Sequence, residues 1–197
     1  MIYFPIELSL LAEPLPIHTP PVMAEVRFQK NSFSEYPQQI RSGTPPSDVL
    51  YSRELGYYAV HYKQPDTAAP GAILQLNEGA IAVFPGEPDE PENAFQLAST
   101  TGTLGPSYTL QPGGSFAVPT GLVFIRFAQG VEVDTQHEAI QKAGYEVAQS
   151  LSYAPNAAWL RTPSGSLLEA LKGISRLEAM PHVEAVEPQM LMPSTSR

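Results

Sequence analysis

Cysteine is absent from the 197 residues of this chain. Its absence excludes disulfides, thiolate metal sites and cysteine nucleophiles together. The cellular compartment stays undetermined, because proteins of oxidising compartments can also lack cysteine.

Basic residues are scarce as well, with 11 Lys and Arg against 20 Asp and Glu and a formal net charge of −9. Binding to nucleic acid depends on clustered Lys and Arg, so we expect no nucleic-acid partner. No run approaches the roughly 20 apolar residues of a membrane span, so we expect a soluble chain that does not enter membranes. Residues 1–11 are apolar but contain no Lys or Arg, which favours a strand over a signal peptide.

Catalytic motifs are missing too. No Gly-x-Ser-x-Gly elbow is present, and Gly113-Gly114 precedes an expected strand rather than the helix that a phosphate-binding loop requires. A zinc site needs at least three ligands at workable spacing, whereas the histidines are scattered at His18, His61, His137 and His182. The pattern predicts that the chain is not an enzyme and has no catalytic residue, metal site or cofactor.

The first 120 residues consist of short apolar or alternating runs separated by Gly- and Pro-containing turns. This pattern predicts a β-rich N-terminal domain over residues 1–120, with a barrel-like or sandwich-like arrangement. The expected strands include residues 22–28, 49–51, 57–62, 72–76, 80–84, 95–98, 108–110 and 115–118.

Residues 121–197 follow a different pattern, and Pro119-Thr120-Gly121 marks the expected boundary. Capping boxes at residues 135–138 and 166–169 predict the starts of two helices. In the second helix Leu167, Leu171, Ile174 and Leu177 fall on one face, and Pro181 ends it. The order β-α-β-β-α-β predicts an α+β, ferredoxin-like C-terminal domain. A single sheet that merges both parts is the main alternative.

Three short motifs in this C-terminal part occur in a particular order. The first is an aliphatic run with one basic residue and then Phe-x-x-Gly-Val, at residues 123–131. The second is Pro155-Asn156-Ala157, and the third is a hydrophobic residue, two further residues and Val-Glu-Pro, at residues 183–188. Together they resemble the pro-domains of subtilisin-like serine proteases over about residues 121–192, although the motifs of the protease itself are absent.

The resemblance implies a function and a partner. Pro-domains of this family assist the folding of a subtilisin-like serine protease and then inhibit it. Their sheet docks on two parallel helices of the protease, and the tail enters the active-site cleft as an extended, product-like strand. A released propeptide, a fragment of a longer protease and a stand-alone inhibitor all fit the chain.

The resemblance also assigns partner-binding residues. Glu187 stands where the family places an acid that caps a helix N-terminus of the protease, and Gln189 replaces a second acid, which implies a weaker second cap. Met190, Leu191 and Met192 would fill hydrophobic subsites. From the residues alone, alternation leaves Trp159 and Tyr153 as candidates for the open face of the sheet, with core packing equally open for Trp159. The alternative function is a non-enzymatic adaptor or a regulatory oligomerisation module.

Overall fold

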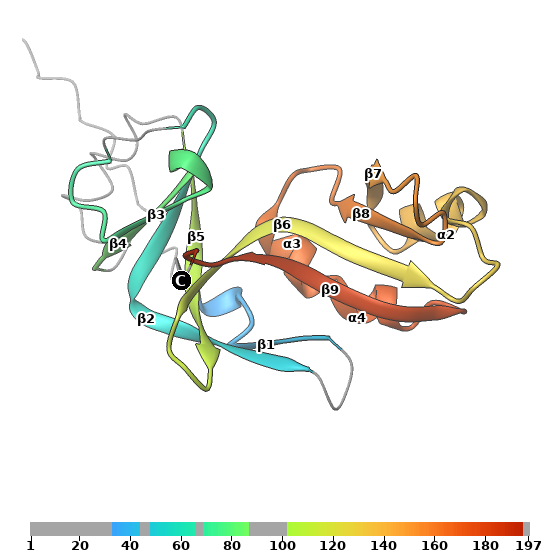
Figure 1. The fold of residues 1–197 in the computed structure, drawn as a ribbon, viewed down its shortest axis with the longest axis horizontal. Coiled ribbons are helices and arrows are strands. Elements are labelled where there is room, and N and C mark those ends of the chain that lie inside the picture. Colours follow the sequence, from blue (N-terminus) through green and yellow to red (C-terminus); the bar gives the residue numbers. More distant parts are fainter. Residues whose placement is uncertain (1–32, 44–47, 66–68, 87–101, 195–197) are drawn as a thin grey trace, which may run out of the picture.

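A computed structural model describes residues 33–43, 48–65, 69–86 and 102–194 of the chain. Nine strands form one sheet in the order β3-β4-β2-β5-β6-β8-β7, with β1 beside β2 and β9 beside β6, and every pairing is antiparallel (Figure 1). The strands are β1 (Gln39–Ser42), β2 (Val49–Tyr62), β3 (Leu74–Leu76), β4 (Ile81–Pro85), β5 (Gly102–Gln111), β6 (Phe116–Phe127), β7 (Glu146–Ser150), β8 (Ala157–Arg161) and β9 (Val183–Leu191).

Short helices complete the described part of the chain. The α-helices are α2 (His137–Lys142), α3 (Leu167–Lys172) and α4 (Ile174–Glu178), and the 3-10 turns are η1 (Phe33–Glu35), η2 (Asn77–Gly79) and η3 (Val133–Gln136). None of these helices is long or apolar enough to cross a membrane, within the residues that the structure describes.

The strand β6 joins the two halves of the molecule. Its first residues pair with β5, and the rest of the strand lies between β8 and β9 (Figure 1). The prediction of a ferredoxin-like β-α-β-β-α-β domain behind a separate β-rich domain is therefore wrong: the chain forms one large, mostly antiparallel sheet. The alternative of a merged sheet describes the connection better, but its proposed pairing of residues 124–125 with 116–118 is wrong, because both segments belong to β6.

The error has a local cause at Pro119-Thr120-Gly121. Gly121 has a φ of +90°, as turn residues often do. Here, however, the register with β9 shifts between Pro119 and Val123 while the strand continues. A bulge tolerates both a proline and a left-handed glycine, so the same residues that predict a turn bend a continuous strand instead.

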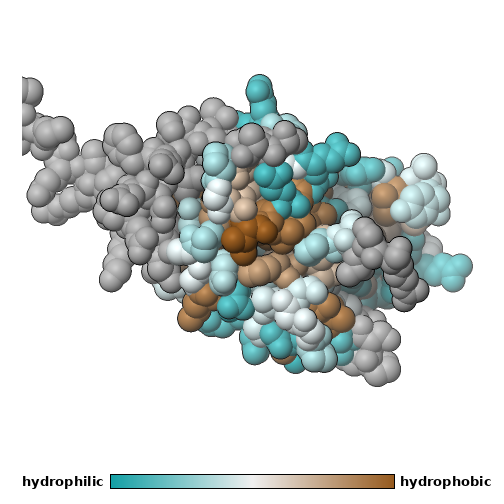
Figure 2. Space-filling model, turned by 60° about the vertical axis from the view of Figure 1, so that its left-hand side comes forward, coloured by the Kyte–Doolittle hydropathy of each residue, from teal (hydrophilic) through white to brown (hydrophobic). Residues whose placement is uncertain are grey.

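Two hydrophobic clusters lie in or beside the N-terminal half, which comprises β1 to β5 and the start of β6. The first joins this half to helix α3, and we call it the junction core: Ile40, Tyr51, Tyr108, Ala117, Leu167 and Leu171. The second lies within the curved sheet, and we call it the sheet core: Ala59, Leu76, Ile81, Val83 and Val118. Figure 2, which looks from the side of β3 and β4, shows apolar side chains gathered near the middle of that face.

The C-terminal half has its own core between the sheet and the helices. Val123, Ile125 and Phe127 of β6 are fully buried in it, together with Ala158 and Leu160 of β8. Successive residues of a strand point to opposite faces, so residues 122, 124 and 126 point to the face that the helices leave open.

The local helix signals have mixed outcomes. The Ser166 side chain accepts a hydrogen bond from the Glu169 N–H at 3.3 Å, as its capping box predicts. The prediction that a capping box at residues 135–138 starts a helix is wrong. The 3-10 turn η3 begins at Val133, and the Thr135 hydroxyl donates to the Glu132 carbonyl at 2.7 Å. The predicted second helix is divided at Gly173, and its predicted apolar residues contact two cores instead of one. The strands expected at residues 22–28 and 95–98 lie outside the described residues.

Candidate functional site

The candidate site is the uncovered side of the C-terminal strands, and it is centred on two aromatic rings. Phe124 of β6 is the register partner of Trp159 of β8 and of Glu187 of β9, while Gln149 of β7 pairs with Trp159. These residues therefore form one row across four strands. The rings of Phe124 and Trp159 meet edge to face, with centroids 5.4 Å apart and planes at 62°. Both side chains are partly exposed.

Within the described part of the chain, helices cover only the other side of these strands. Figure 1 shows α2, α3 and α4 behind β6, β8 and β9, so that the view looks onto the uncovered side. We call this side the open face and define it by Phe124, Arg126, Glu146, Gln149, Trp159, Arg161 and Glu187. A sheet covered on one side presents the other side to water or to a partner.

Charged pairs border the two rings. The Arg161 guanidinium Nε lies 2.7 Å from the Glu146 carboxylate, and Arg126 Nε lies 3.5 Å from that of Glu184. All four side chains are exposed, so these pairs add little to the stability of the fold. An aromatic centre with a polar rim is the composition of many protein–protein interfaces, where Trp is enriched among the residues that dominate affinity.

Glu187 lies where the open face meets the N-terminal half. Its strand partner is Phe124, and its negative charge contributes to the environment of Tyr51 of β2. Burial first, and then the Glu187 carboxylate, raise the pKa of the Tyr51 phenol. Of the predicted partner-binding residues, the structure thus brings Trp159 and Glu187 into one row, with Phe124 between them. Tyr153 lies in the β7–β8 turn and not on a strand of the open face.

The other predicted residues lie at the end of β9. The Thr120 hydroxyl is 2.7 Å from the Gln189 side-chain oxygen and donates to it. Met190 packs against the junction core and Leu191 against the sheet core, whereas Met192 follows the strand with 40% of its surface exposed. Met190 and Leu191 are therefore part of a strand that the N-terminal half holds. Their expected role as subsite residues stays a prediction, and it requires the end of β9 to detach.

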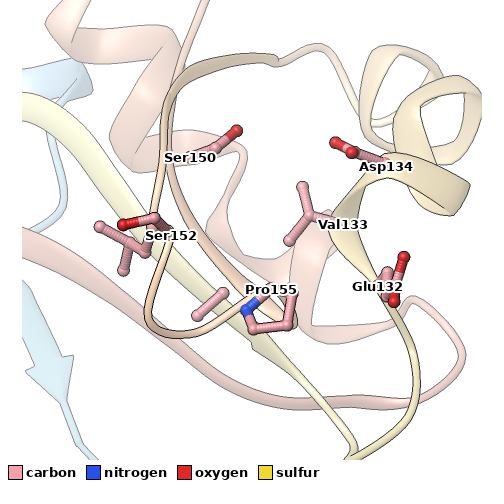
Figure 3. Close-up of a pocket in the computed structure, with 8 residues that line it drawn as sticks. Glu132, Val133, Asp134, Ser150, Ser152 and Pro155 are labelled. Atoms are coloured by element: carbon pink, nitrogen blue, oxygen red, sulfur yellow. The ribbon is translucent and has the colours of Figure 1, made fainter.

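Two shallow hollows lie at the far end of the C-terminal half, between the β6–η3 loop and the β7–β8 hairpin. The first measures about 250 Å³, and Asp134 and Ser150 lie on opposite sides of it with Val133 between them (Figure 3). In the described residues no group of three or more His, Asp or Glu side chains is placed to hold a metal ion. These hollows provide no site with defined chemistry.

Sequence reasoning missed two features of the molecule. Phe124 is not among the residues predicted for the open face. The alternation that points to Trp159 also applies to β6, where Val123 and Ile125 on either side of Phe124 are buried. The ring nitrogen Nε2 of His61, in β2, is buried and has no hydrogen-bond partner among the described residues, and burial lowers the pKa of this histidine to about 4. No local signal distinguishes this histidine from the other three.

No protein-family model, no curated protein and no solved structure matches this chain.

Proposed function

We propose that this chain is a non-enzymatic binding module that docks its open face on a subtilisin-like serine protease and inhibits it. The observation that carries the proposal is the Phe124–Trp159 pair, two partly exposed aromatic rings on an uncovered sheet face. The three motifs at residues 123–131, 155–157 and 183–188 support the choice of partner through their resemblance to protease pro-domains.

The polar rim supports a protein partner over a small ligand. Arg126 with Glu184 and Arg161 with Glu146 form two exposed ion pairs, so both signs of charge are available to a partner surface. Glu187 supplies one further carboxylate at the margin. A carboxylate in this position can accept hydrogen bonds from the N–H groups at a helix N-terminus of the protease.

The test is an inhibition titration against a panel of subtilisin-like proteases. Trp159→Ala and Phe124→Ala should each raise the inhibition constant about thirtyfold or more, the cost of removing a central interface residue. Tyr153→Ala is the matched control, because it removes an aromatic ring that is 84% exposed but lies in the β7–β8 turn. The proposal fails if the unaltered chain inhibits no protease of the panel, or if the control weakens inhibition as much as Trp159→Ala.

One observation favours the alternative of an oligomerisation module. Strand β7 pairs only with β8 among the described residues, and its last three residues are exposed. An uncovered edge can pair with another copy of the chain. Sedimentation of the pure protein distinguishes the two functions, because a stable oligomer without any effect on proteases supports the alternative.

A further inference from the structure

The end of β9 connects the open face to the N-terminal half. In Figure 1 this strand leaves the helix-covered part of the sheet and runs back toward β5 and β2. Its last residues pair with the start of β6, Met190 with Pro119 and Leu191 with Val118. At residues 189–191 the chain therefore returns to the N-terminal half.

Two cores hold this strand end from opposite sides. Met190 contacts the junction core, in which Ile40, Tyr51 and Tyr108 come from the N-terminal half. Leu191 contacts the sheet core, to which β2, β3 and β4 contribute four of the five buried residues. The two side chains diverge because neighbouring residues of a strand point to opposite faces. The hydrogen bond from Thr120 to Gln189 adds a polar contact next to them.

We propose that the N-terminal half competes with the protease for the end of β9. A protease that binds residues 189–192 as an extended peptide must first draw Met190 and Leu191 out of these two cores. This inference rests on the proposed function and gives the N-terminal half a regulatory role. Met190 and Leu191 are partly buried, so drawing each side chain out of its core costs up to about tenfold in equilibrium constant. The competition therefore weakens any cleft-filling step by up to about a hundredfold when both side chains must leave.

A reversible disulfide tests the competition directly. The chain has no cysteine, so Val118→Cys with Leu191→Cys introduces a single possible bond. Directly opposite residues of antiparallel strands have Cα atoms about 4.5–5.5 Å apart, within the range that a disulfide spans. The oxidised protein should inhibit a subtilisin-like protease at least about tenfold more weakly than the same protein after reduction. Equal inhibition in both forms overturns the competition and leaves the proposed function standing.

A labelling experiment tests release of the strand end without a protease. Leu191→Cys and Val186→Cys lie in the same strand, but Val186 is buried in the core under the helices. Under native conditions a thiol reagent should modify the cysteine at 191 at least about tenfold faster than the one at 186, because only the strand end opens locally. Equal rates would show that residue 191 is exposed only by global unfolding and would overturn the inference, even if no protease is inhibited.

A third variant connects release to the N-terminal half. Val83→Ala removes two methyl groups from the sheet core that Leu191 contacts. It should speed labelling at 191 about fivefold, the usual effect of such a truncation on a local packing equilibrium, and leave the rate at 186 unchanged. If Val83→Ala has no effect at 191, the N-terminal half does not hold the strand end and the inference is wrong.

Discussion

Acidification should destabilise this fold through His61. The Nε2 atom of His61 is buried and has no hydrogen-bond partner in the described part of the chain. A Cβ atom added at Gly105 would come within 3.2 Å of this nitrogen and within 2.7 Å of a Leu167 methyl group, so an apolar side chain lies close to the ring. The imidazole thus lies where β2 and β5 meet helix α3. A proton on this ring would place a charge in an apolar contact between the two halves.

The size of the effect follows from the two pKa values. Burial lowers the pKa of His61 from the ordinary value of 6.5 to about 4 in the folded protein. Between these values the unfolded chain binds a proton that the folded chain does not, so the free energy of unfolding falls as the pH falls. The loss begins near pH 6.5, is complete below about pH 4, and amounts to about 3 kcal/mol. That is a large share of the roughly 5–15 kcal/mol that stabilises a typical domain.

Urea unfolding at several pH values between 7.5 and 4 measures this loss. His61→Leu removes the titrating ring, so its stability should fall less on acidification, and the difference from the unaltered protein should approach about 3 kcal/mol. His137→Leu is the control for replacing a histidine by leucine, because the His137 side chain of α2 is exposed. Parallel pH profiles for His61→Leu and the parent would refute the reasoning.

Three further changes should lower stability by predictable amounts. Tyr145→Phe removes the buried hydrogen bond from the Tyr145 hydroxyl to the Ala170 carbonyl, 2.6 Å long, and should cost about 1–3 kcal/mol in chemical unfolding. Ser166→Ala removes the cap of α3 and should cost about 1 kcal/mol, with no loss if the hydrogen bond to Glu169 contributes nothing. The fragment 121–197 begins inside β6 and loses the partners of residues 190 and 191, so it should lack a cooperative thermal transition, and a sharp transition above ordinary mesophile temperatures would contradict this.

Local signals predicted the parts of the fold that depend on neighbouring residues. Ser166 caps its helix, as the sequence indicates, and a strand follows Pro181, although it begins at Val183 because His182 has a φ of +64°. Gly144 adopts a φ of +93° just after α2, a conformation that suits glycine at the end of a helix. In each case the interaction that decides the conformation lies within a few residues of the signal.

The failures come from contacts between distant segments. The capping box at Thr135 is a correct local pattern, yet the Val133 N–H bonds to the Pro155 carbonyl at 2.9 Å and the helical turn starts three residues earlier, with Glu132 at its N-cap. Pro119 and Gly121 suit a turn as well as a bulge, and only the pairing of β6 with β9 decides between them. For the candidate site, alternation left Trp159 open between the uncovered face and the core, and its register with Phe124 places it on the open face. No pattern in residues 189–192 indicates that the N-terminal half holds them.

The central claim is that the open face itself binds a subtilisin-like serine protease. The most direct test is the affinity for a protease whose active-site serine is covalently blocked, because cleft filling is then prevented and only face docking remains. Isothermal titration should show binding by the unaltered chain and by Tyr153→Ala. The double variant Phe124→Ala with Trp159→Ala should bind at least about thirtyfold more weakly while it remains folded by circular dichroism. Equal affinity of the folded double variant and the unaltered chain would contradict the account.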